Sequence, residues 1–123
     1  MIGYITLGAQ DLQRAAAFYD ELLGLIGMTR QMAWPTGIAW GRNKEDVMFA
    51  VCTPFNGEAA SAGNGTMVAL MAPNEVTIQA VHAKALALGG TCDGPAGPRG
   101  DGFYAAYFRD LDGNKLNAFL MKG

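Results

Sequence analysis

The chain has 123 residues, of which half are hydrophobic, and a formal net charge of -2 at pH 7. A chain of this length fits one domain and can bury a core without disulfide or metal staples. Its cationic side chains are scattered and form no basic patch, which argues against nucleic acid and membrane surfaces as partners. No segment reaches the roughly 20 apolar residues of a membrane span, and no signal peptide is recognisable, so we expect a cytoplasmic protein.

The first half of the chain is predicted to form a strand, a helix and three further strands. Residues 2–8 alternate weakly, as a half-buried strand does. Asp11 suits the cap of a helix that begins at Leu12, because its carboxylate can accept from the free amides of the first turn. Apolar residues then recur at helical spacing, and Gly24 or Gly27 ends the run. Three short strands are expected at about residues 28–34, 38–42 and 47–53.

The second half repeats the pattern of the first. An offset of 63 residues places Asp11 on Asn74 and Gly27 on Gly90. Self-similarity at such a period indicates a duplicated structural unit. The second unit is predicted to contain a strand at about residues 66–71, a helix at about 74–88, a Gly/Pro-rich loop at 93–101 and a final hairpin.

These elements predict one α+β domain over residues 1–123. Module one covers about residues 1–53, a small polar linker covers about 54–64, and module two covers about 65–123. Two βαβββ modules side by side form a curved half-barrel sheet with the helices on the outside. The concave face of such a sheet is then the expected ligand site.

The final hairpin carries the candidate working surface. The strand over residues 115–121 alternates Lys115, Asn117 and Phe119 with aliphatic residues, so one of its faces is polar and aromatic. The segment 110–114 (DLDGN) contains acidic and amide side chains of the kind that bind cations. A calcium loop needs a longer run of ligands and a distal Glu, so we interpret this segment as a turn.

Residues 4–24 (YITLGAQDLQRAAAFYDELLG) and 107–116 (YFRDLDGNKL) resemble the vicinal oxygen chelate superfamily. This superfamily includes glyoxalase I, bleomycin and fosfomycin resistance proteins, and extradiol dioxygenases. The resemblance covers essentially the whole chain, including the paired βαβββ modules. It implies up to four inward-pointing His, Glu or Gln ligands that hold a divalent cation, which acts as a Lewis acid on the substrate.

The positions that the resemblance gives to the metal ligands carry other residue types. They are Tyr4, its repeat mate Met67, Asn117, and Met48 or Ala50. A thioether is a soft ligand that does not suit an oxygen-rich site, and a neutral amide is a weak one. The single histidine, His82, is predicted to lie on the second helix. We therefore predict that the chain holds no metal and no cofactor.

The same positions are interpreted as the wall of a small-molecule pocket, because such pockets are mostly apolar with a few polar groups. A phenol is a poor general acid at neutral pH, so Tyr4 is expected to orient a ligand by hydrogen bonding. The alternative is that these side chains fill the barrel and leave no space. The predicted pocket residues are Tyr4, Thr6, Trp40, Met48, Met67, Ala69, Tyr104, Asn117 and Phe119.

Three functions are open at this point. The first is metal-free binding of a small amphipathic or aromatic molecule. The second is a lyase or isomerase of the glyoxalase type, either metal-independent or dependent on a divalent metal. The third is a dimerising structural domain with a collapsed cavity. The resemblance implies a homodimer, and Cys52 and Cys92 are interpreted as free thiols because they lack metal-type spacing.

Overall fold

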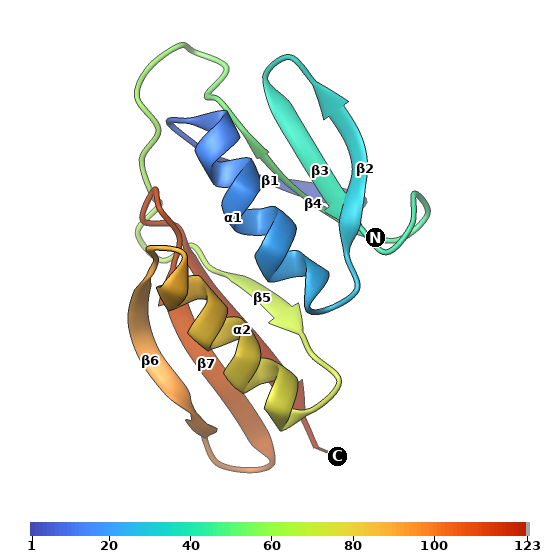
Figure 1. Cartoon of the computed structure of the whole chain (residues 1–123), viewed down its shortest axis with the longest axis vertical. Helices are drawn as coiled ribbons and strands as arrows, with labels where there is room; N and C mark the ends of the chain where they lie inside the picture. Colours follow the sequence, from blue (N-terminus) through green and yellow to red (C-terminus); the bar gives the residue numbers. More distant parts are fainter. Residues whose placement is uncertain (123) are drawn as a thin grey trace. The chain divides into compact units, whose positions relative to one another are not determined.

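The computed structural model describes residues 1–122, and the chain divides into two compact units. Module 1 comprises Met1–Ser61, and module 2 begins at Ala62. Within the described residues, each module runs strand, helix and three further strands (Figure 1). The predicted α+β class and its two βαβββ modules are confirmed.

Module 1 forms a four-stranded mixed sheet with the strand order β1-β4-β3-β2. β1 runs parallel to β4, whereas β3 is antiparallel to both of its neighbours. The helix α1 connects β1 to β2 and packs on β2, β3 and β4. The elements are β1 (Tyr4–Gly8), α1 (Leu12–Gly24), β2 (Thr29–Trp34), β3 (Gly37–Gly41) and β4 (Met48–Cys52).

Module 2 repeats this topology with the strand order β5-β8-β7-β6. β5 runs parallel to β8, and the remaining pairs are antiparallel. The helix α2 packs on β6, β7 and β8. The elements are β5 (Val68–Met71), α2 (Glu75–Ala87), β6 (Thr91–Pro98), β7 (Phe103–Arg109) and β8 (Lys115–Met121).

The prediction of a loop over residues 93–101 is wrong for most of its length, because β6 extends to Pro98. β6 lies at the edge of its sheet, where a proline without an N–H group is tolerated. Its pairing with β7 is irregular around Gly94. The glycines and prolines therefore mark an edge strand with bulges and not a loop.

The helix caps confirm the internal repeat. The Asp11 carboxylate accepts from the Arg14 amide at 3.1 Å, and the Asn74 side chain accepts from the Thr77 amide at 2.8 Å. Each side chain satisfies a first-turn amide that has no partner inside its helix. The same offset of 63 residues relates the first and last residues of the two helices.

An aromatic cluster fills the space between α1 and its sheet. The buried Tyr19 ring lies 4.7 Å from Phe49 and 5.8 Å from Trp40, measured between ring centroids. Trp40 donates its indole N–H to Asp20 at 2.8 Å. Asp20 also accepts two hydrogen bonds from the Arg30 guanidinium, at 2.9 and 2.7 Å. The carboxylate thus links α1 to β3 and β2.

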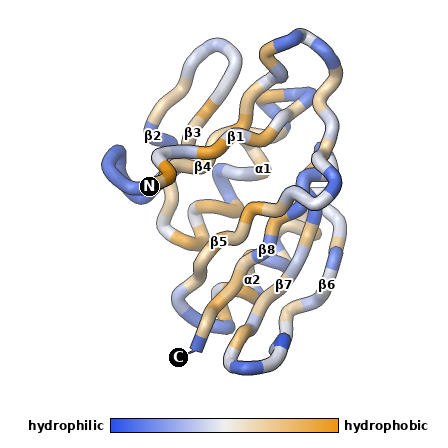
Figure 2. The backbone as a smooth tube through the Cα atoms, turned by 180° about the vertical axis from the view of Figure 1, so that it is seen from behind, coloured by the Kyte–Doolittle hydropathy of each residue, from blue (hydrophilic) through white to orange (hydrophobic). Residues whose placement is uncertain are grey.

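Hydrophobic segments follow the strands of both modules. In Figure 2 the tube is orange along β1 and β5 and blue in several of the connecting loops. Under α2, the fully buried apolar side chains include Ile78, Val81, Phe108 and Leu116. Within residues 1–122, no helix has the length and apolar character that a membrane crossing requires. Cys52 and Cys92 are both free thiols.

Stability should depend on pH through Asp20. The hydrogen bonds from Arg30 hold the pKa of this carboxyl below its usual value, with a smaller contribution from Trp40. A depressed pKa gives stability that is present above the unfolded-state value, about 4, and is lost as pH falls through the folded-state value. We expect Asp20→Asn to lower the melting temperature near neutral pH and to flatten its decline in acid. Thermal melts followed by circular dichroism across this range measure both effects.

Asp46→Asn is the matched control, because it removes an exposed ion pair with Arg42. Exposed pairs are worth about 0–1 kcal/mol, so this variant should melt almost as the parent does. Equal pH profiles for Asp20→Asn and the parent would contradict the assignment.

Candidate functional site

The sheet of module 2 has one face under α2 and one face away from it. On α2, Gln79 donates to the Tyr104 hydroxyl at 2.9 Å, so Tyr104 of β7 points toward the helix. Because side chains alternate along a strand, Phe103, Ala105, Tyr107 and Arg109 point to the opposite side. We call this side the helix-free face of module 2.

The strand register places further residues on the helix-free face of module 2. Residues directly opposite each other in neighbouring strands share a face. Across β7 and β8, Tyr107 lies opposite Asn117, and Arg109 lies opposite Lys115. Across β8 and β5, Asn117 lies opposite Ala69. Phe119 and Met71 form the next pair along the same strands.

Asn117 is the polar centre of this face. The residue is only 1% exposed, and its side-chain oxygen has no hydrogen-bond partner. A buried polar atom without a partner costs about 1–3 kcal/mol. A donor from a bound molecule or a water that reaches this oxygen would recover that energy.

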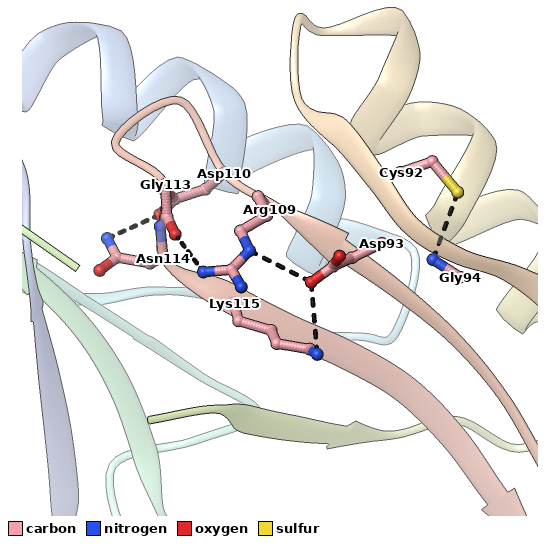
Figure 3. Close-up of polar contacts among 8 residues, drawn as sticks. All are labelled: Cys92, Asp93, Gly94, Arg109, Asp110, Gly113, Asn114 and Lys115. Atoms are coloured by element: carbon pink, nitrogen blue, oxygen red, sulfur yellow. Dashed lines mark hydrogen bonds and ion pairs between the residues drawn. The ribbon is translucent and has the colours of Figure 1, made fainter. Parts of the chain in front are cut away.

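One end of the face carries a network of charges. Asp93 on β6 accepts from the Arg109 Nε atom at 3.1 Å and lies 3.3 Å from the Lys115 Nζ atom (Figure 3). Lys115, and then Arg109, hold the pKa of the Asp93 carboxyl below its usual value. Arg109 also donates to the Gly113 carbonyl at 3.0 Å. These contacts fix the cations beside the β7–β8 turn.

Two cations lie over the Tyr107 ring. The Lys115 ammonium is 5.4 Å from the ring centroid, and the Arg99 guanidinium is 5.5 Å from it. Both distances are within the range of cation–π attraction. Arg99 is held in place because it also donates to the carbonyls of Gly97 and Pro95, at 2.9 and 2.5 Å.

The other end of the face is aromatic and apolar. The rings of Phe103 and Phe119 stack with centroids 5.7 Å apart. Met71 and Met121 lie beside them in the register and are exposed. Along β8, the face therefore changes from charged at Lys115, through the amide of Asn117, to apolar at Phe119.

The interpretation of residues 110–114 as a turn agrees with the hydrogen bonds. One carboxylate oxygen of Asp110 accepts from the amides of Asp112 and Asn114, both at 2.9 Å. Its other oxygen accepts from the Asn114 side chain at 3.0 Å (Figure 3). The acidic side chain thus closes the hairpin and fixes the register that follows it.

The structure places some of the predicted pocket residues beneath the helices and others on the faces away from them. Trp40 is buried among aromatic rings beneath α1, and Tyr104 points toward α2, so both lie on helix-covered faces. In module 1, Tyr4 and Thr6 of β1 lie opposite Met48 and Ala50 of β4, on the face away from α1.

Tyr4 is 63% exposed in that position. In module 2, the structure brings together Ala69, Asn117 and Phe119. Met67 is an exposed residue that directly precedes β5.

The predicted pocket omits Tyr107, Lys115, Asp93 and Arg99, although the alternation of the last strand places Lys115 on its polar face. The first two had a signal, because the hairpin is symmetric about Asp112 and residues equally far from it are paired. Pairing Asn117 with Tyr107 follows directly from that symmetry. Asp93 had no such signal, because the irregular pairing of β6 decides where it lies. Arg99 directly follows β6, and its side chain is held by the carbonyls of Gly97 and Pro95.

The residue types that stand at the superfamily's ligand positions do not suit a divalent cation. Tyr4 in module 1 has a phenol, and Met67 and Asn117 in module 2 have a thioether and an amide, each of which is a poor ligand for such an ion. Lys115, next to Asn117 on the same face, adds positive charge. Within residues 1–122, no three His, Cys, Asp or Glu side chains lie close enough together to hold a metal.

His82 lies elsewhere, on the helix side of module 2. Its Nε2 atom is 3.3 Å from the Cys92 sulfur, and burial lowers its pKa. Cys92 pairs with Phe108, a residue of the helix-covered face. The histidine therefore takes no part in the helix-free face.

Comparison with known proteins decides the family. The model of the Glyoxalase/Bleomycin resistance protein/Dioxygenase superfamily matches residues 1–118. The chain belongs to this superfamily. The resemblance found in the sequence is thereby confirmed. None of the curated protein sequences that were compared matches the chain.

Solved structures agree with this assignment. A glyoxalase/bleomycin resistance protein from Albidiferax ferrireducens T118 is 37% identical, with 97% of each chain covered and a TM-score of 0.89. A glyoxalase-related enzyme from Fulvimarina pelagi is 25% identical over 97% of this chain and 86% of its own, with a TM-score of 0.78. The lactoylglutathione lyase of Agrobacterium tumefaciens shares the fold, at 20% identity over 97% of this chain and 92% of its own and a TM-score of 0.68.

The turn gives a direct test of the hairpin. Asp110→Ala leaves two buried or half-buried backbone amides without their acceptor, so it should lower the free energy of unfolding by about 1–3 kcal/mol. Asp110→Asn keeps one carbonyl-type oxygen and should lose less. Urea denaturation measures both variants. Equal stability of Asp110→Ala and the parent would show that the carboxylate does not hold the turn.

Proposed function

We propose that this protein binds a small amphipathic or aromatic molecule, without a metal, on the helix-free face of module 2. The observation that carries the proposal is the buried, unpartnered oxygen of Asn117. An acceptor in that state favours a ligand that brings a hydrogen-bond donor. The flanking rings of Tyr107 and Phe119 supply the apolar contact that small-molecule sites use.

The charge network favours binding over proton transfer. A lyase or isomerase of the glyoxalase type needs a group whose pKa lies near the working pH. Lys115, and then Arg109, shift the pKa of the Asp93 carboxyl downward, which makes it a weaker base. The donor set at the metal position does not suit a Lewis acid either. The enzyme alternative therefore has less support than binding.

The proposal also includes a cytoplasmic homodimer. Tyr4, Met32 and Met71 are exposed apolar or aromatic residues on the helix-free faces of their modules, and surface of this kind favours association. Light scattering coupled to gel filtration measures the mass in solution. A monomeric mass at micromolar concentration would remove the dimer from the proposal and leave the binding function to its own test.

Divalent metals should not stabilise the protein. A site filled at about a hundred times its dissociation constant adds about 2.7 kcal/mol of stability, which shifts melting by several degrees. We expect chelator-treated protein to melt at the same temperature with nickel, zinc, manganese, iron or magnesium. A saturable rise with one of these ions would contradict the metal-free proposal and favour the lyase alternative.

Replacing Asn117, whose side-chain oxygen has no partner, should separate stability from binding. Asn117→Leu removes a buried polar group and roughly conserves the side-chain volume. We therefore expect its free energy of unfolding to be about 1 kcal/mol higher than that of the parent. Tyr104→Phe is the control for the ligand site, because Tyr104 lies on the helix-covered face. Urea denaturation gives the stabilities, and a thermal-shift screen of small molecules gives the binding.

In that screen, hits of the parent should persist in Tyr104→Phe and disappear in Asn117→Leu. A strong loss of stability in Asn117→Leu would mean that the amide is a structural hydrogen-bonding group. No hit for the parent across aromatic and amphipathic compounds would favour the dimerising structural domain.

A further inference from the structure

The cations of the helix-free face gather in the same row as Asn117. Lys115 precedes Asn117 by two residues, and its ammonium lies over the ring of Tyr107, the residue directly opposite Asn117. The Arg99 guanidinium lies over the same ring. Two positive groups therefore flank the pair formed by Tyr107 and Asn117.

Positive charge exceeds negative charge on this face. Asp93 is the carboxylate that meets both Arg109 and Lys115. One carboxylate thus pairs with two cations, and Arg99 is a third cation on the same face. Asp110 directs its oxygens to the N–H groups of the turn, as described above. The ammonium of Lys115 has three donors, and a ligand can use those that Asp93 leaves.

The apolar end of the face completes the row that follows β8. Phe119 follows Asn117 by two residues, a spacing of about 7 Å along a strand. Its ring stacks on Phe103 and continues the row away from the charges. A molecule that lies along β8 meets a cation, an acceptor and an aromatic surface in that order.

We propose that this face selects small carboxylates with an apolar tail and a hydrogen-bond donor next to the carboxylate. The carboxylate contacts Lys115 and Arg99, the donor reaches the Asn117 oxygen, and the tail lies on Phe119. An N-acylamino acid or a 2-hydroxy acid with an apolar chain has these groups in this order. The inference rests on the proposed function, because it names the ligand class of the same face.

A carboxylate fits these cations better than a phosphate does. Phosphate sites typically use forked arginine contacts or a helix N-terminus. Neither arginine of this face presents a free fork, because Arg109 donates to Asp93 and Gly113, and each terminal nitrogen of Arg99 already donates to a carbonyl, of Gly97 or of Pro95. The remaining N–H groups of Arg99 can still donate singly to a carboxylate. The ammonium of Lys115 acts as a point charge, which a carboxylate can approach from several directions.

N-hexanoylglycine and its methyl ester test the inference as a matched pair of probes. They share the tail and the amide N–H, and only the acid carries a charge. In isothermal titration calorimetry, we expect the parent protein to bind the acid at least about tenfold more tightly, since hydrogen bonds to charged groups contribute about 1.5–3 kcal/mol. Affinity for the acid should also fall as salt is raised.

Variants assign the charge to its residue. Lys115→Met keeps most of the stem and removes the ammonium, so the acid should lose about tenfold in affinity while the ester is unchanged. Lys44→Met, in the loop between β3 and β4, is the matched control and should bind both probes as the parent does. Arg99→Gln provides a second variant, on an exposed side chain, in case Lys115→Met does not fold.

The outcomes separate this inference from the proposed function. Equal binding of acid and ester by the parent, lost in Asn117→Leu, would overturn the carboxylate selectivity and keep the binding function. Binding of neither probe by the folded parent would overturn the ligand class, and the wider screen described above then tests the binding function alone. Preference for the acid that persists in both Lys115→Met and Arg99→Gln would overturn the assignment to these cations.

Discussion

Each module has one helix for a four-stranded sheet, and one helix covers only one face of such a sheet. This constraint orders the rest of the structure. Strand alternation sends half of the side chains under the helix, where Phe108 and Leu116 are fully buried in module 2. The other half is left for other contacts. The first and last strands of each module pair in parallel, and the helix and the two other strands together form the long connection that a parallel pair needs.

The two modules share one topology but place their charge networks on different faces of the sheet. In module 1, the Asp20 carboxylate joins the buried Trp40 to Arg30 and thereby ties helix to sheet. In module 2, the charge network lies on the helix-free face, where Asp93 contacts Arg109 and Lys115. Within a duplicated fold, a charged network can thus serve packing in one copy and surround a candidate site in the other.

The residue types on the helix-free face of module 2 determine the character of the candidate site. A metal site needs several anionic or imidazole donors that converge on one point. Here Asn117 presents a single neutral oxygen, and Lys115 lies two residues away on the same strand. An environment of this kind repels a cation and attracts an anion.

The sequence by itself determined the α+β class, the two βαβββ modules, the helix caps and the turn at Asp110, because these depend on local periodicity and on contacts within a few residues. It also indicated Asn117, whose polarity interrupts an apolar strand. Only the tertiary structure decided which face each residue occupies. Trp40 and Tyr104 looked like pocket residues, yet both lie under helices, since a single aromatic residue is compatible with either face. The placement of Asp93 followed from the irregular register of β6, which no local pattern encodes.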